Sequence, residues 1–246
     1  MRVHIHADAG ELGRAAAAEA ADVISAAIAR HGEALVVFAT GASQFATLEA
    51  LVAADIDWSR VSGVHLDEYV GISPEHRASF RRYLRERVVA RLPTLGHFAM
   101  IAGNAPDLSA EIARLNTLLT GRRVDLCLAG IGENGHLAFN DPPADFEAEA
   151  PYLVVDLDAA CRQQQVNEGW FPDLGSVPAQ AVSMSIRQIM RAERLVLSVG
   201  DRRKAEAVRN TIEGPVSPAC PASIIQGHKA ASVHLDTASA SLLAGR

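Results

Sequence analysis

Residues 124–143 read VDLCLAGIGENGHLAFNDPP, and this stretch decides the fold. Its first seven residues form a short apolar run that is typical of a buried strand, and a loop of unusual composition follows. Similar apolar runs, such as 34–39 (ALVVFA) and 195–200 (LVLSVG), alternate with longer helical patterns along the chain. Strands that alternate with helices indicate βαβ units and a mostly parallel sheet. We therefore expect a three-layer, doubly wound, Rossmann-like α/β fold in a single domain over residues 1–246.

The same patterns predict the other elements. Helices are expected over 12–31, 77–91, 107–119 and 203–214 and near 157–168, and strands over 61–66 and 231–236 and near 97–101, 151–155 and 181–186. In parallel sheets of this kind, ligands bind beyond the carboxyl ends of the strands. That rule singles out four polar loops, which are TGAS (40–43), DEY (67–69), GENGHLAFND (132–141) and GDRRK (200–204).

Composition excludes several classes of protein. Hydrophobic residues make up 49% of the 246 residues and charged residues 21%, so a large core can be buried and global disorder is not expected. The net charge of −6 argues against a nucleic-acid binder and against a membrane-surface binder, because both need a basic face. A small anionic ligand remains compatible with this charge, since a few local donors suffice to bind it.

The cysteines predict a reducing compartment. There are three, at 127, 161 and 220, and their odd number and wide spacing favour neither a disulfide framework nor a zinc site. Residues 1–14 lack the apolar run of a signal peptide, and no stretch approaches the roughly 20 apolar residues of a membrane helix. We expect a cytoplasmic protein.

Two of the loops have the composition of a phosphate site. Thr40, Gly41, Ala42 and Ser43 lie between a buried strand and a helix, where backbone N–H groups and the two hydroxyls can bind an anion. The alternative is an ordinary turn in which Ser43 only caps the helix. Lys204 lies at the start of the helix after LVLSVG, at the same edge of the sheet, and its charge can bind a phosphate. The alternative is a solvated helix residue.

The other two loops carry groups for proton transfer. Asp67 ends a strand in apolar sequence, where partial desolvation raises the pKa of a carboxyl and suits it to act as a base; a loop-closing Asp is the alternative. In 130–143, glycines that include Gly132 and Gly135 let the backbone approach a ligand closely around His136. Asp141 follows five residues later and can orient the imidazole, unless His136 is a buried structural histidine.

Several motifs of other chemistries do not occur. The chain has no GxSxG nucleophile elbow, no HExxH and no CxxC. These observations together predict proton transfer on a bound sugar phosphate, without a metal and without an organic cofactor.

Four segments of the sequence resemble the glucosamine-6-phosphate deaminase (isomerase) family. They occur in the family's order and, with the sequence between them, span about residues 34 to 236; the DEYVG and GxNGHxAFNxP motifs are highly specific together. The segments are FATGASQFATLEAL (38–51), VHLDEYVGISPEHRASFRRYL (64–84), DLCLAGIGENGHLAFNDP (125–142) and KAEAVRNTIEGPVSPACPASIIQ (204–226).

The resemblance implies conversion of glucosamine 6-phosphate into fructose 6-phosphate and ammonia. Asp67 matches the family's base, which moves a proton between C2 and C1, and His136 matches the residue that helps to open the pyranose ring. Asp141 stands where the family usually has Glu and would support His136, and Asn134 stands where members have Asp or Asn. The segment 40–43 and Lys204 match the phosphate site, and the positions of Gly132 and Gly135 are expected beside the substrate.

The sequence departs from this family in two places. The phosphate loop reads TGAS where TGGT or TGGS is expected, so that Ala42 replaces a flexible glycine. Residues 163–171 (QQQVNEGWF) stand where better-known members carry an arginine that reaches the phosphate, and neither Asn167 nor Glu168 replaces that charge. These departures leave the exact substrate and any allosteric control open, and the sequence leaves a homo-oligomer open as well.

Three alternatives to this reaction stay open. The first is a 6-phosphogluconolactonase, which shares the fold; DEYVG, in place of a DER-type motif, and Asp141 after AFN favour the deaminase. The second is a sugar-phosphate-binding regulator, which is expected to have lost Asp67 or His136. The third is a deaminase for another hexosamine 6-phosphate, such as galactosamine 6-phosphate.

Overall fold

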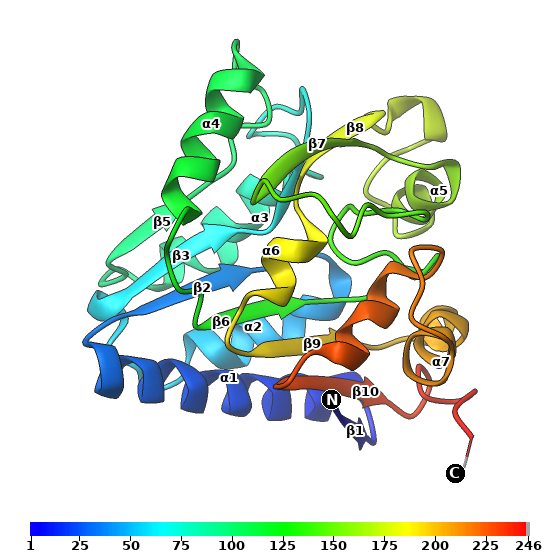
Figure 1. The fold of residues 1–246 in the computed structure, drawn as a ribbon, viewed down its shortest axis with the longest axis horizontal. Helices are drawn as coiled ribbons and strands as arrows, with labels where there is room; N and C mark the ends of the chain where they lie inside the picture. The colour runs from blue at the N-terminus through cyan, green and yellow to red at the C-terminus, as the bar shows by residue number, and fades with distance from the viewer. Residues whose placement is uncertain (245–246) are drawn as a thin grey trace.

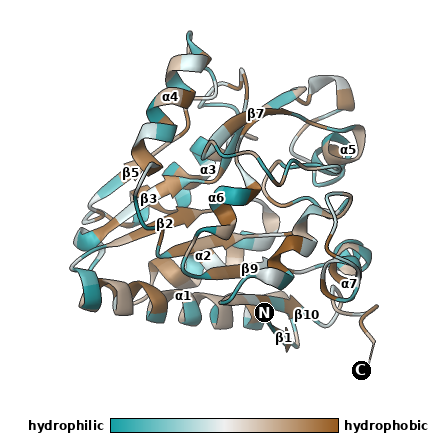
Figure 2. Ribbon diagram, viewed as in Figure 1, coloured by the Kyte–Doolittle hydropathy of each residue, from teal (hydrophilic) through white to brown (hydrophobic). Residues whose placement is uncertain are grey.

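The computed structural model describes residues 1–244, which are arranged around a seven-stranded sheet (Figure 1). All its strand pairs are parallel. Across the sheet, the strands are β1 (Arg2–His6), β10 (Ala231–Asp236), β9 (Leu195–Val199), β6 (Leu126–Ala129), β2 (Ala34–Phe38), β3 (Val61–His65) and β5 (His97–Ala99). Every residue of β2, β6 and β9 is buried, and this explains why these strands are continuous apolar runs (Figure 2).

The strand order reverses between β2 and β6. From β2 the chain proceeds outward to β3 and β5, and it then returns to the other side of β2 to form β6, followed by β9 and β10. The two central strands pair through Val36 with Leu126 and Val37 with Cys127. Their carboxyl ends therefore flank a topological switch point, which is where open α/β sheets bind ligands.

One face of the sheet is covered by α1 (Ala9–His31) and α2 (Phe45–Val52), which pack against each other. The carboxylate of Asp8 accepts a hydrogen bond from the Glu11 N–H and caps α1, and Gly32 ends the helix in a left-handed conformation. Gly13 permits the close approach of α2, since a Cβ at this position would lie 2.4 Å from the Ala46 Cβ.

The opposite side carries a second, antiparallel sheet. It consists of β4 (Asp67–Tyr69), β8 (Gln180–Met184) and β7 (Tyr152–Asp156), in that order. Figure 1 shows β7 and β8 between α4 (Leu108–Leu119) and α5 (Ala159–Asn167), on the side away from α1. The remaining helices are α3 (Phe80–Arg87), α6 (Ile186–Met190) and α7 (Ala205–Glu213). None of the helices within residues 1–244 combines the length and the apolar character that a membrane crossing needs.

The expected three-layer, doubly wound α/β fold is confirmed, with corrections to individual elements. Residues 67–69 were expected as a loop and form β4, because their backbone pairs with β8. The strands predicted near 151–155 and 181–186 exist, but they belong to the antiparallel sheet. The helix predicted over 77–91 is shorter, with α3 followed by a separate 3₁₀ turn at Val89–Arg91.

Candidate functional site

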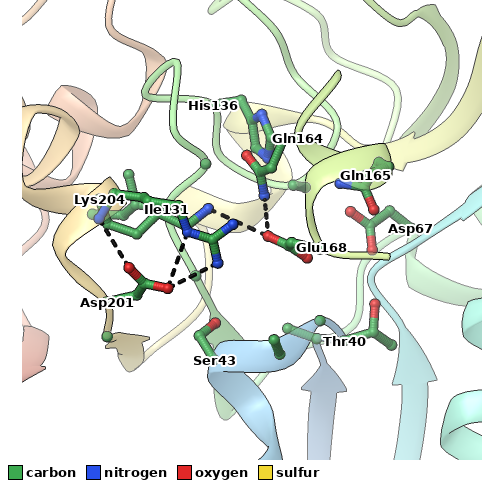
Figure 3. A pocket seen from close by; sticks show the side chains of 18 of the residues that line it. Thr40, Ser43, Asp67, Ile131, His136, Gln164, Gln165, Glu168, Asp201 and Lys204 are labelled. Carbon is green, nitrogen blue, oxygen red and sulfur yellow. Dashed lines mark hydrogen bonds and ion pairs between the residues drawn. The ribbon is translucent and has the colours of Figure 1, made fainter. Parts of the chain in front are cut away.

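The polar loops predicted at the carboxyl edge of the sheet meet around one cavity of about 440 Å³. Thr40 and Ser43 lie on one side of it and His136 lies opposite them, while Asp67 and Lys204 face it from the two remaining sides (Figure 3). The cavity is therefore next to the switch point between β2 and β6, and groups from distant parts of the chain face it.

The phosphate loop is fixed to its neighbours by hydrogen bonds. Gly41 has a φ of 96°, a conformation that favours glycine, and its carbonyl accepts a bond of 3.1 Å from the Tyr83 hydroxyl. The buried Gln44 donates from Nε2 to the Ala129 carbonyl at 2.9 Å and so ties this loop to β6. Ser43 does not cap α2, because that helix begins after Gln44 and its cap makes no side-chain bond. The Ser43 side chain instead lines the cavity.

Lys204 is a buried cation that faces this loop. It ends the 3₁₀ turn Arg202–Lys204, directly before α7, and its side chain is only 8% exposed. Its Nζ lies 3.8 Å from a carboxylate oxygen of Glu168. Burial lowers the pKa of Lys204, and the nearby Glu168 charge acts in the opposite direction. The alternative of a solvated helix position is thus wrong.

Asp67 is a buried carboxyl at the start of β4. It pairs with Ser183 of β8, is 5% exposed and lines the cavity. Burial, and secondly the charge of Glu68, raise the pKa of Asp67 to about 8. A carboxylate with this pKa accepts a proton far more readily than an ordinary one near neutral pH.

His136 lines the cavity and lies close to Asp141. His136 Nδ1 lies 3.1 Å from Asp141 Oδ1, within hydrogen-bonding reach, although the ring is turned away from the line of a regular bond. Burial alone raises the pKa of Asp141, but the contacts with His136 and Asn134 bring it below the usual value. The imidazole lies against Gly132, where a Cβ would be 2.2 Å from His136 Cε1.

Three of the predicted residues do not line the cavity. These are Asn134, Gly135 and Asp141. Asn134 donates from Nδ2 to Asp141 Oδ1 at 3.0 Å and accepts from the His136 N–H at 3.1 Å. Gly135 has a φ of 82° and would place a Cβ 3.1 Å from Cys220 Sγ, so its glycine serves the turn and not a ligand.

Sequence reasoning missed several residues that line the cavity. Helix α5 and the residue after it contribute Gln164, Gln165 and Glu168, and the turn after β9 contributes Asp201 and Arg203. Glu168 accepts hydrogen bonds from Gln164 Nε2 at 2.8 Å and from Trp170 Nε1 at 3.2 Å. The unusual composition of 163–171 marks this segment, but only the packing of α5 places its side chains at the cavity.

Two clusters within residues 1–244 bring three metal-ligating groups within 4.8 Å of one another, and neither suits a metal ion well. In the cluster of His136, Asp141 and Cys161, burial raises the pKa of the Cys161 thiol far above its usual range, which disfavours the thiolate. In the cluster of His4, Glu19 and His234, the Glu19 carboxylate already binds the guanidinium groups of Arg2 and Arg194.

Comparison with known proteins gives consistent results. The pattern of the family described as glucosamine-6-phosphate isomerases/6-phosphogluconolactonase matches residues 7–234. The glucosamine-6-phosphate deaminase of Lactobacillus delbrueckii subsp. bulgaricus is 34% identical over 243 residues, covering 99% of this chain and 100% of the relative. The glucosamine-6-phosphate deaminase of Exiguobacterium sibiricum is 38% identical over 217 residues, covering 88% of this chain and 84% of the relative.

Solved structures agree with this result. A monomeric glucosamine-6-phosphate deaminase superposes with a TM-score of 0.87 at 32% identity, covering 99% of this chain and 100% of the other. The 6-phosphogluconolactonase of Trypanosoma brucei has a TM-score of 0.80 at 17% identity, covering 99% and 98%, a likeness that shows the fold alone.

Proposed function

This chain belongs to the family of glucosamine-6-phosphate isomerases and 6-phosphogluconolactonases, and we propose that it is a deaminase of that family. The reaction converts glucosamine 6-phosphate and water into fructose 6-phosphate and ammonia. Deaminases at 34–38% identity support this choice, and they span most of the chain. The proposed unit of function is the whole chain, residues 1–246.

One observation supports the proposal above the others. Asp67 has a pKa of about 8 and faces the same cavity as the phosphate loop and the buried Lys204. Isomerisation of a sugar phosphate needs a base of this kind beside C1 and C2 while the phosphate is held elsewhere. A hydrolase acting on a lactone requires no proton transfer between two carbons, so this base favours the deaminase.

The reaction follows from these positions. The segment 40–43 and Lys204 bind the phosphate, which takes no part in the chemistry but fixes the sugar. His136, held by Asp141, moves the proton that opens the pyranose ring. Asp67 then takes the proton from C2 and returns it to C1, while a proton passes from the amino nitrogen to O1. C1 becomes a CH2OH group, and an imine is left at C2. Water adds to this imine, and the C–N bond breaks to give the ketone and ammonia.

A substrate panel tests the proposal. Glucosamine 6-phosphate, galactosamine 6-phosphate and 6-phosphogluconolactone are each supplied to the protein, and ammonia, ketose phosphate and lactone opening are followed. We expect ammonia and fructose 6-phosphate in equal amounts from the gluco substrate. Lactone opening without ammonia would make the protein a lactonase, and preference for the galacto compound would change the substrate only.

We propose that the enzyme acts in the cytoplasm on this free sugar phosphate. The neighbour at 32% identity is described as monomeric, which supports a monomer here over a homo-oligomer. Light scattering at the concentration of the activity assay would decide the oligomeric state.

A further inference from the structure

A phosphate bound in this cavity faces several negative charges. Glu168, Asp201 and Asp236 all line it. A phosphate group beside carboxylates needs more than one fixed positive charge, because like charges repel strongly at short range in a partly desolvated site. Among the described residues that line the cavity, the lysine and arginine side chains are those of Lys204 and Arg203.

Helix α5 provides no positively charged side chain to the cavity, because the residues with which it lines the cavity are Gln164 and Gln165. The residue directly after α5 is Glu168, whose side chain is 10% exposed and whose carboxylate lies 3.8 Å from Lys204 Nζ (Figure 3). Hydrogen bonds from Gln164 and Trp170 hold this carboxylate in place. Glu168 is therefore held beside Lys204, where it can compete with an anion for this lysine.

Arg203 is held at the rim of the same cavity. Its Nε and Nη2 donate to Asp201 Oδ2 at 3.1 and 2.8 Å, and its Nη1 lies 3.7 Å from Glu133. Asp201 itself has a φ of 83°, an unusual conformation for this residue type, and its carboxylate also accepts the Arg203 N–H. The side chain is 45% exposed, so the guanidinium is oriented but accessible, and its planar fork suits a phosphate.

We propose that Arg203 is the second phosphate-binding cation of this enzyme and that Glu168 competes with the phosphate for Lys204. The inference rests on the proposed function only for the identity of the sugar phosphate. The presence of an anion site does not depend on that function. When the phosphate enters, Lys204 exchanges Glu168 for the ligand, and Arg203 adds its own hydrogen bonds from the rim. The turn after β9 thus supplies both positive charges, and Glu168, directly after α5, supplies the competing carboxylate.

The experiment compares variants of neighbouring residues. Arg203→Gln removes the charge, and Arg202→Gln is the matched control, because Arg202 is exposed and does not line the cavity. Glu168→Gln removes the competing carboxylate at nearly constant volume. Dissociation constants for inorganic phosphate are measured by calorimetry, and KM and kcat are measured with glucosamine 6-phosphate. Arg203→Lys keeps the positive charge but removes the guanidinium group, and it provides the test if Arg203→Gln fails to fold.

The expected results separate the roles. Arg203→Gln should raise both the dissociation constant for inorganic phosphate and KM by about 10- to 100-fold, which is the scale of hydrogen bonds to a charged group. The value of kcat should change little. Arg203→Lys should recover part of that loss, and Arg202→Gln should resemble the wild type. Glu168→Gln should lower the dissociation constant for inorganic phosphate by about 3- to 10-fold, as expected for the loss of one modest competing ion pair.

The proposal and the proposed function can fail independently. Equal phosphate affinities of the wild type and both Arg203 variants would overturn the role of Arg203, even if ammonia is released from glucosamine 6-phosphate. Unchanged or weaker phosphate binding by Glu168→Gln would overturn the competition. Conversely, a wild type that releases no ammonia, together with weakened phosphate binding by Arg203→Gln, would refute the deaminase and leave this inference standing.

Discussion

Asp67 and Glu68 are consecutive residues of β4, but only Asp67 lines the cavity, while the carboxylate of Glu68 accepts four hydrogen bonds behind it. Neighbouring side chains of a strand point to opposite faces, which explains the division. The donors to Glu68 are the Ser79 hydroxyl and three backbone N–H groups at residues 69, 80 and 81. Glu68 thus fixes the start of α3 and places a negative charge behind the proposed base.

The pH dependence of kcat/KM should report the ionisation of Asp67. Its pKa is about 8, and only the carboxylate can accept the C2 proton, so kcat/KM should fall about tenfold per pH unit below that value. Removing the charge in Glu68→Gln should move this acid limb to lower pH, because the repulsion that raises the pKa of Asp67 is gone. The measurement is a pH profile of both proteins, with circular dichroism to verify folding. An acid limb at the same pH in both would show that Glu68 does not influence the base.

The stability of Asp67→Asn should exceed that of the wild type at pH 8. The carboxyl has a raised pKa in the folded protein, about 8 against 3.8, so the folded state holds one more proton between these values. The stability that this group contributes is therefore present below about pH 4 and is lost as the pH rises to about 8.

Asparagine does not titrate, so the advantage of the variant should grow across this range, on the order of 1 kcal/mol per pH unit. Thermal unfolding of both proteins at pH 5, 6, 7 and 8 measures it. A constant difference in Tm across these pH values would contradict a raised pKa for Asp67.

Much of the fold was predictable because its central strands are buried on both faces. Runs such as 34–39 and 195–200 are continuous in apolar residues, and this pattern marks a parallel strand independently of its neighbours. β4 was not predictable in this way. It has three residues, two of them acidic, and it exists because β8 provides a partner from more than a hundred residues away.

The candidate site was predictable to the extent that its groups follow strand ends. The segment 40–43, Asp67, His136 and Lys204 all lie at the same edge of the sheet, as the parallel topology requires. The place of Glu168 depends instead on how α5 packs over the cavity, which no local pattern encodes. Likewise, the sequence could not distinguish Arg203 from Arg202, because the turn after β9 decides which of them faces the cavity.

Lys204→Ala should raise KM for the sugar phosphate more than it lowers kcat. The phosphate does not react, so its contact with Lys204 is present in the ground state as well as in the transition state. Loss of one charge-assisted contact costs about 1.5–3 kcal/mol. The chain has one other lysine, the exposed Lys229, and Lys229→Ala is the matched control. A KM for Lys204→Ala that equals the wild-type value would remove Lys204 from the phosphate site.

Turnover should survive exhaustive treatment with EDTA. The proposed steps use only Asp67, His136 and the water that adds to the imine. Of the two metal-ligating clusters among residues 1–244, one has a disfavoured thiolate and the other has its carboxylate bound to two arginines. The assay follows ammonia release before and after chelation and removal of the chelator. Activity that disappears and returns with a divalent cation would refute a metal-free mechanism.

Asp67 and His136 should be separable by the form of the substrate. Proton abstraction at C2 is needed whatever the starting form, so Asp67→Asn should nearly abolish turnover of every substrate while binding of the phosphate persists. His136, 3.1 Å from Asp141, is assigned to ring opening, and a positioned general acid or base typically contributes about 10²–10⁴-fold. His136→Ala should therefore reduce kcat/KM for cyclic glucosamine 6-phosphate by about that factor. An analogue locked in the open-chain aldehyde form bypasses this step, so its kcat/KM should fall much less.

The measurement compares the losses of kcat/KM for the cyclic substrate and for the open-chain analogue in the same variant. Asp67→Asn is the control, and it should turn over neither substrate. Equal losses in His136→Ala would mean that His136 serves the proton transfer between C2 and C1, or only supports its loop against Gly132, and the division of labour between the two residues would be wrong.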